Sequence, residues 1–363
     1  MAIDQRLVGL FLEVARIEGT SGRERAVADR LRRFLEDLGM EVREDDAGVA
    51  SGGNAGNLIA RAGSGGDLAM MAHMDTARPS GGSVAVVHAD RITSDGTTVL
   101  GVDDRAGIAM LLYAAEKAIR EERGRRDFTL GFTVAEETTL GGSRHIRFDP
   151  AIRMAVLFDS SERPGRFICR SYGCQAIKVA VHGRASHSGI APEKGVSAIA
   201  VAARAIAALP LGRVDAETTA NVGIIRGGSA VNVVPEQTTL EAEVRSLHPA
   251  RVEALVARFH EIFLAEAERA GAALTFDAQW DFEPYEVDES KELYRRVAAA
   301  LGKAGLEPIP RISAGGSDAN SLNARGLPAI NLGIGAQNPH GNDELILLED
   351  LEKGAAIAMA LLS

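Results

Sequence analysis

The chain has 363 residues, of which 46% are hydrophobic and 25% are charged, and its formal net charge at pH 7 is −10. This length predicts two domains rather than one core. The negative charge argues against nucleic acid or an acidic membrane surface as a partner, because both attract basic proteins. The only cysteines, Cys169 and Cys174, are too few for a disulfide scaffold or a cysteine-rich zinc module, so a reducing cytoplasm is expected. No run approaches the roughly 18 uninterrupted apolar residues of a membrane span.

The first part of the chain predicts an α/β domain. Charged residues interrupt the apolar stretch over residues 1–19, which indicates an amphipathic helix and not a signal peptide. A second helix follows, and Gly39 ends it. The runs "DLAMMA", "FTLGFTV" and "MAVLF" are nearly continuous in apolar residues, which is typical of strands buried on both faces of a mostly parallel sheet. A helix that includes "RAGIAMLLYAAEKAI" separates the first two runs.

The pattern changes near Gln175. The segments "QAIKVAVHG" and "TTLEAEVRS" alternate polar and apolar residues, as half-exposed antiparallel strands do, and two helical segments accompany them. After Glu283 and Pro284 the α/β pattern returns. We therefore expect a mixed, mostly parallel sheet flanked by helices in a catalytic domain of residues 1–174 and 284–363. An α+β domain of residues 175–283 is expected to be inserted into it.

Titratable residues follow each apolar strand of the first half. His73 and Asp75 follow the first, Glu136 and Glu137 the second, and Asp159 the third. In an open α/β sheet the carboxyl ends of the strands form the ligand site, so these side chains are expected to converge. Asp103 and Asp104, at the start of a predicted helix, would join them. Carboxylates this close repel one another unless a positive charge lies among them, which indicates a divalent metal.

Local spacing suggests how two of these pairs divide their roles. Residues two apart in an extended chain point the same way, so Asp75 is expected to accept a hydrogen bond from the ring of His73. The neighbours Glu136 and Glu137 are expected to point to opposite sides, one towards a metal and one free to move protons. Taken alone, each pair also fits a structural role, as a turn or as the start of a helix. The chain has no H-E-x-x-H, P-loop, Rossmann or G-x-S-x-G motif.

Seven motifs in order carry a family resemblance over nearly the whole chain: "AHMDT", "GVDDRAG", "VAEETTLGGS", "LFDSS", "GRASHSGIAPEKGVSAI", "GGSDAN" and "NPHGNDE". The chain resembles the peptidase T-like tripeptidases. These belong to the dinuclear zinc aminopeptidase and amidohydrolase family, which includes carboxypeptidase G and succinyl-diaminopimelate desuccinylase.

The resemblance implies two Zn²⁺ ions per subunit, with Co²⁺ or Mn²⁺ as possible substitutes. The implied ligands are His73, Asp103, Glu137, Asp159 and His340. Asp103 would bridge the ions, with Asp104 as a neighbour that shapes the bridge. Glu136 would be the general base for a water that the metals activate, and Asp75 would orient His73. Asp159 stands where desuccinylase-like members tend to carry Glu, which is similar to the aminopeptidase side of the family.

The resemblance also assigns residues to the substrate. His187 resembles a histidine that reaches from the inserted domain into the partner subunit's site and stabilises the oxyanion, which implies a homodimer through that domain. Asn232 and Arg245 would bind a peptide carboxylate, and Gly315 and Gly316 would let backbone amides approach the substrate.

The leading hypothesis is a cytoplasmic metal-dependent aminopeptidase that removes the N-terminal residue from short peptides. An N-acyl-amino-acid amidohydrolase or carboxypeptidase would use the same metals but a different substrate pocket. A hypothesis of another class is a catalytically silent, metal-binding scaffold.

Overall fold

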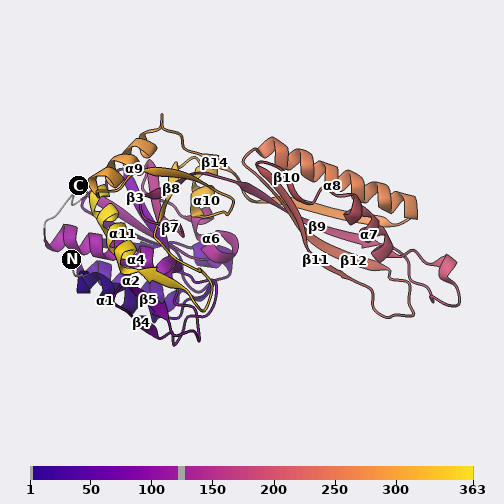
Figure 1. Cartoon of the computed structure of the whole chain (residues 1–363), viewed down its shortest axis with the longest axis horizontal. Helices are drawn as coiled ribbons and strands as arrows, with labels where there is room; N and C mark the ends of the chain where they lie inside the picture. Colours follow the sequence, from indigo (N-terminus) through magenta and orange to yellow (C-terminus); the bar gives the residue numbers. More distant parts are fainter. Residues whose placement is uncertain (1–2, 122–126, 363) are drawn as a thin grey trace. The chain divides into compact units, whose positions relative to one another are not determined.

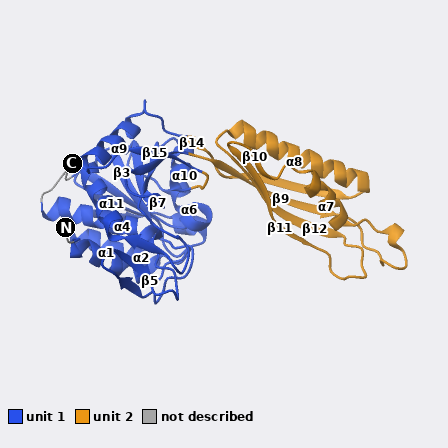
Figure 2. Cartoon of the chain, viewed as in Figure 1, with its two compact units in different colours: residues 1–170, 286–313, 317–363 blue, residues 171–285, 314–316 orange. Residues whose placement is uncertain are grey.

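The computed structural model describes residues 3–121 and 127–362, which form two compact units (Figure 2). Unit 1 contains residues 1–170, 286–313 and 317–363, and unit 2 contains residues 171–285 and 314–316. The expected insertion of an α+β domain into an α/β domain is confirmed. Among the described residues, no helix is both long enough and apolar enough to cross a membrane.

Unit 1 is built on a 9-stranded sheet with the strand order β1-β2-β6-β3-β7-β16-β8-β14, in which β15 also pairs with β8; β17, β5 and β4 form a separate 3-stranded sheet (Figure 1). The strands are β1 (Glu41–Glu44), β2 (Leu58–Ala62), β3 (Leu68–His73), β4 (Ala85–Val87), β5 (Arg91–Ser94), β6 (Phe128–Thr133), β7 (Met154–Ser160), β8 (Arg166–Ser171), β14 (Tyr285–Glu286), β15 (Ile309–Ser313), β16 (Ala329–Gly333) and β17 (Leu345–Leu347).

The central strands β6, β3, β7 and β16 are parallel, as the sequence predicts. Every residue of β3 and β6 is buried. Because successive side chains of a strand point to opposite faces, the helices must cover both faces of this part of the sheet. The parallel arrangement brings the carboxyl ends of β3, β6 and β7 to one edge, where the titratable residues lie.

Helices flank this sheet. They are α1 (Gln5–Ala15), α2 (Arg25–Asp37), α3 (Ala47–Ser51), α4 (Val102–Arg120), α5 (Glu136–Thr139), α6 (Gly141–His145), α9 (Glu292–Lys303), α10 (Asp318–Ala324) and α11 (Leu348–Leu361). Helix α4 packs against β3 and β7, and α1 and α11 pack against α4. Helix α2 ends just before Gly39, whose φ of 82° lies in the left-handed region that glycine adopts without strain.

Unit 2 is a 5-stranded sheet with two long helices packed on it. Its elements are β9 (Gly173–His182), the short 3₁₀ helix Pro192–Lys194, α7 (Ala198–Ala208), β10 (Gly212–Asp215), β11 (Thr218–Gly227), β12 (Gln237–Ser246), α8 (Pro249–Ala270) and β13 (Ala273–Phe282). The strand order is β10-β11-β12-β9-β13, and every pair is antiparallel. Apolar residues from α7, α8 and alternate positions of the strands form one core, so the polar–apolar alternation of the sequence marks the half-buried sheet correctly.

Candidate functional site

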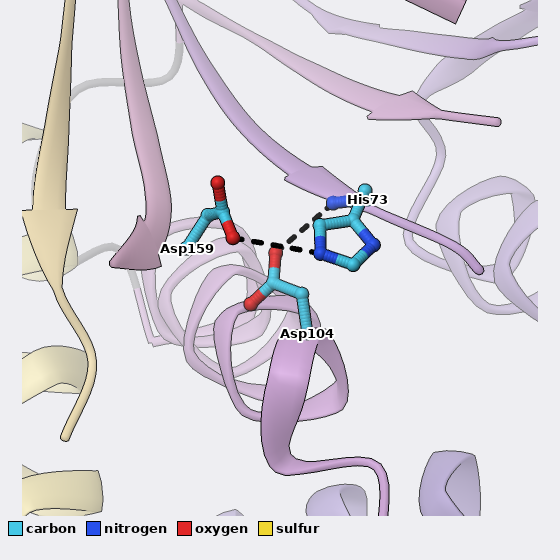
Figure 3. A group of neighbouring side chains, drawn as sticks. All are labelled: His73, Asp104 and Asp159. Carbon is cyan, nitrogen blue, oxygen red and sulfur yellow. Dashed lines mark hydrogen bonds and ion pairs between the residues drawn. The ribbon is translucent and has the colours of Figure 1, made fainter. Parts of the chain in front are cut away.

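His73 is the centre of the site in unit 1. It is the last residue of β3, and only 2% of its surface is exposed. Its Nε2 atom lies 2.9 Å from Oδ1 of Asp103. The same atom lies 3.5 Å from Oδ1 of Asp159, which belongs to β7 (Figure 3). Neighbouring parallel strands therefore bring His73 and Asp159 together at their carboxyl ends.

Asp103 links His73 to a second group of side chains. Its Oδ2 atom lies 3.4 Å from Nε2 of His340, and the same nitrogen lies 3.1 Å from Oε1 of Glu137. The two oxygens of Asp103 thus face two different histidines. His73, Asp103 and Glu137 form one of two groups of side chains, within the described chain, whose ligand atoms are close enough to hold a metal ion.

Asp104 belongs to the other such group, with His73 and Asp159 (Figure 3). Its carboxylate, however, already accepts two backbone hydrogen bonds. Oδ2 accepts from the N–H of His73 at 3.0 Å, and Oδ1 accepts from the N–H of Gly107 at 3.1 Å. Asp103 and Asp104 also depart from helical dihedral angles at the start of α4. The oxygens of Asp104 are thus committed to the backbone, whereas those of Asp103 face side-chain nitrogens.

Asp75 is fully buried and contacts both His73 and the Glu136–Glu137 turn. Nδ1 of His73 lies 3.0 Å from the backbone carbonyl oxygen of Asp75 and 3.4 Å from its carboxylate. The carboxylate also accepts hydrogen bonds from the N–H groups of Glu136 and Glu137, at 3.0 and 3.1 Å, and from the Ser21 hydroxyl at 2.6 Å. Asp75 therefore fixes the turn between β6 and α5 as well as the position of the His73 ring.

The pKa values of the titratable groups in this site are strongly shifted by burial and by the neighbouring groups. Burial, together with the negative charge of Asp159, raises the pKa of Glu136 well above its ordinary value. Burial also raises the pKa of Glu137. Burial alone would raise the pKa of Asp103 too, but hydrogen bonds from His340 and His73 lower it below its usual range. The carboxylates of Asp103 and Glu137, 3.4 and 3.1 Å from its Nε2 atom, raise the pKa of His340 to about 10. The site thus concentrates negative charge that a cation would stabilise.

The donor set fits divalent metal ions. Imidazole nitrogen and carboxylate oxygen are the ligands that zinc and neighbouring metals take in proteins. Oε1 of Glu137 is buried and makes no hydrogen bond, although it lies 3.1 Å from Nε2 of His340. A buried carboxylate oxygen without a hydrogen bond is costly, and a metal ion would satisfy it.

Sequence reasoning missed several residues that hold this site. Asn331 of β16 donates a hydrogen bond to Oδ2 of Asp159 at 3.0 Å. Glu24, which is fully buried, accepts one from the N–H of Ala135 at 3.0 Å. Asp318, the first residue of α10, accepts one from the Thr133 hydroxyl at 2.5 Å, and burial raises its pKa to about 6. Asp318 lies within the "GGSDAN" motif, whereas nothing in the local sequence marks Asn331 or Glu24.

The remaining predicted residues lie in unit 2. His187 and Asn232 are exposed and adjacent, because the N–H of Ser188 donates to the carbonyl of Asn232 at 3.0 Å. Arg245 is not free: Nε and Nη2 both donate to the Glu243 carboxylate, at 3.0 and 2.9 Å. Its Nη1 donates to the carbonyl of Ala314, next to Gly315 and Gly316. A side chain at Gly316 would meet the Phe282 ring, so this glycine also has a packing role.

Comparisons with known proteins agree with this site. Residues 171–271 match the peptidase dimerisation domain of the M20 family, and residues 80–166 match the M42 glutamyl aminopeptidase family. The crystal structure of aminopeptidase PepT from Bacillus cereus ATCC 10987 is 34% identical, has a TM-score of 0.91, and is matched over 100% of this chain and 99% of that one. The chain belongs to the peptidase T-like family of metallopeptidases.

Two further relatives of this peptidase T-like chain cover its whole length. A tripeptidase from Staphylococcus aureus subsp. aureus Mu50 is 29% identical, with a TM-score of 0.94 and coverage of 100% of this chain and 98% of that chain. The uncharacterized protein YqjE of Bacillus subtilis (strain 168) is 33% identical over 100% of this chain and 99% of its own length. The catalytic and inserted segments are therefore both shared.

Proposed function

We propose that this chain is a metal-dependent aminopeptidase that removes the N-terminal residue from short peptides, in the manner of a tripeptidase. Its similarity to the Bacillus cereus aminopeptidase and the Staphylococcus aureus tripeptidase over the whole chain supports this activity. The observation that carries the proposal is the contact of Asp103 with both His73 and His340, because a carboxylate between two histidines is suited to bridge two metal ions.

We propose two Zn²⁺ ions per subunit, with Co²⁺ or Mn²⁺ as alternatives. His73 and Asp159 would hold the first ion, His340 and Glu137 the second, and Asp103 would bridge them. Asp104 would support this bridge through its backbone hydrogen bonds. When bound, the metals would polarise the scissile carbonyl and make a water more acidic.

Glu136 is proposed as the general base. It is half-buried and interacts electrostatically with Asp159 and His73, and its carboxylate is not tied to any of the five proposed ligands by a hydrogen bond or ion pair that the structure records. It is thus available to take a proton from the attacking water and to return it to the leaving amine. Asp75 would hold the backbone of both glutamates, so that Glu136 faces the substrate and Glu137 faces the second metal.

The substrate-binding residues are proposed in unit 2. His187 would stabilise the developing oxyanion in the partner subunit's site, which requires a homodimer, and the match to a peptidase dimerisation domain supports that assembly. Asn232 would contribute to binding of the peptide carboxylate, and Gly315 and Gly316 to close approach of the backbone. Arg245 would join them in binding the carboxylate, because a guanidinium has five N–H donors and its recorded bonds to Glu243 and Ala314 use three.

We also propose a cytoplasmic location. Cys169 and Cys174 are both buried and free, which suits a reducing compartment. Burial raises the pKa of both thiols, so neither is activated as a nucleophile.

The decisive experiment compares trialanine with N-acetyl-trialanine, using zinc-loaded and chelator-stripped protein. We expect metal-dependent cleavage of the free peptide alone. Cleavage of the acetylated peptide alone would contradict the proposal in favour of an N-acyl-amino-acid amidohydrolase or carboxypeptidase. A protein that binds two metals but cleaves neither these peptides nor other unblocked di- and tripeptides would support the silent scaffold.

A further inference from the structure

The start of helix α4 is kinked. Asp103 and Asp104 depart from helical dihedral angles, and after this kink the Asp104 carboxylate accepts a hydrogen bond from the N–H of Gly107. The N-cap position before the kink is Gly101, which has no side chain to bond to the N–H groups there. The first N–H groups of a helix lack partners within the helix and normally bond to a nearby Ser, Thr, Asp or Asn. The start of α4 carries Asp103, so the question of what holds these N–H groups bears directly on the site.

The N–H groups of Gly101 and Asp103 bond to a residue more than 240 positions later in the chain. Oε2 of Glu344 accepts a hydrogen bond from the N–H of Gly101 at 2.6 Å, and Oε1 accepts one from the N–H of Asp103 at 3.1 Å. Only 1% of the surface of Glu344 is exposed. A carboxylate at this position also interacts favourably with the positive end of the helix dipole.

Glu344 is itself fixed in the segment that carries His340. Its N–H donates to the carbonyl of Gly341 at 3.2 Å, which closes the turn after His340. Its carbonyl accepts from the N–H of Ser94, the last residue of β5, at 3.3 Å. The backbone of Glu344 is thus anchored beside His340, while its side chain is bound to the backbone of Asp103.

We infer that Glu344 is a positioning residue that aligns Asp103 and His340 for the second metal ion. The proposal rests on the metal site of the proposed function. Nε2 of His340 lies 3.4 Å from Oδ2 of Asp103, and Glu344, which follows His340 by four residues, accepts a hydrogen bond from the N–H of Asp103. A shift of the Asp103 backbone would turn Oδ2 away from His340. The first ion depends less on Glu344, since His73 and Asp159 belong to the central strands β3 and β7.

The substitution Glu344→Gln tests this role. Glutamine has nearly the same shape but only one acceptor oxygen, so one of the two backbone N–H groups would face an NH₂ group. Loss of such a supporting hydrogen bond typically weakens metal affinity by about 10- to 100-fold. We expect that loss at the second site, and a change of less than about threefold at the first.

The measurement is a titration of the full-length, metal-free protein with Co²⁺, followed by visible absorption and by the bound metal per chain. The absorption spectrum reports the coordination of each site, and thermal unfolding of the metal-free protein reports overall stability. Glu349→Gln is the matched control, because Glu349 is exposed on α11 and pairs with Lys353. Glu344→Asp is the second variant: it keeps the charge, but the side chain is too short to reach both N–H groups, so the same selective loss is expected.

The outcomes separate this inference from the proposed function. Wild-type protein that binds two Co²⁺ ions, with selective loss of the second in both Glu344 variants, supports the inference. Variants that bind both ions as the wild type does would overturn it, as would an equal loss at both sites accompanied by a lower melting temperature. Wild-type protein that binds fewer than two ions would contradict the metal site on which the proposed function depends. If Glu344→Gln does not fold, Glu344→Asp decides between these results.

Discussion

Glu136 and Glu137 follow one another in the chain but face different partners. Glu137 lies against His340, whereas Glu136 interacts electrostatically with Asp159 and His73. Replacing Glu136 with Gln keeps the shape of the side chain but removes its capacity to take a proton. We expect kcat for a free tripeptide to fall by about 10²- to 10⁴-fold, with the metal content unchanged. Unaltered turnover would exclude Glu136 as the base.

The buried carboxylate of Asp75 is predicted to affect catalysis indirectly, by fixing the positions of the residues that it hydrogen-bonds. It accepts from the N–H groups of Glu136 and Glu137 and from the hydroxyl of Ser21. Asp75→Asn turns one acceptor into a donor, so we expect kcat/KM to fall by about 10- to 100-fold. Ser21→Ala, which removes only the hydroxyl, is the control and should have a smaller effect. Equal losses in the two variants would contradict the role of Asp75 in fixing the turn.

At the scale of the elements, an ionic cluster joins β1 to α2. Arg25 and Arg32 of α2 both pair with Glu44 of β1, and the N–H of Gly56 donates to the same carboxylate. The hydrogen bond with Arg25 is the largest cause that lowers the pKa of Glu44, from 4.5 to about 2. A lowered pKa means that the folded protein favours the ionised form. The cluster therefore stabilises the fold fully above about pH 4.5, and this contribution is lost as the pH falls towards 2.

The variant Glu44→Gln should therefore be less stable than the wild type at pH 7, and the difference should fall to roughly half or less at pH 3, which still lies above the folded pKa of about 2. We expect a difference of about 1–2 kcal/mol in the free energy of unfolding, after allowance for partial exposure to solvent. Urea denaturation at pH 7 and pH 3 measures it. Glu41→Gln on the same strand removes an exposed pair with Arg61 and is the control, with an expected effect within about 0.5 kcal/mol. If the difference in unfolding free energy between Glu44→Gln and the wild type stayed constant with pH, this account would be contradicted.

Regular elements follow well from the sequence because their determinants are local. The apolar runs that become β3, β6 and β7 mark a buried parallel sheet, and their last residues mark the site. The contacts of the site are harder to predict. Glu344 and Asp103 are 241 residues apart in the chain, and Asn331 supports Asp159 across 172 residues. The left-handed backbone of Ala135 before Glu136, with φ of 52°, is likewise imposed by tertiary contacts such as the hydrogen bond to Glu24.

At the scale of the whole molecule, two units carry different parts of the proposed function. The proposed metal ligands lie in unit 1, and His187 lies in unit 2 within the segment that matches a peptidase dimerisation domain. If His187 serves the partner's site, a mixture of His187→Ala and Glu136→Gln proteins should recover activity, because one of the two sites in each hybrid dimer is intact. We expect up to about a quarter of wild-type activity after full subunit exchange. No recovery despite demonstrated exchange would place His187 in its own chain's site or outside catalysis.

The most direct test of the central claim is the location of the metals themselves. Crystals of the zinc-loaded protein, measured with X-rays on both sides of the zinc absorption edge, give an anomalous map that identifies zinc by element. The account predicts two peaks about 3.5–4 Å apart. One would lie about 2.0–2.2 Å from atoms of His73 and Asp159, the other at the same distance from His340 and Glu137, with Asp103 touching both. A single peak, or peaks away from these side chains, would contradict it.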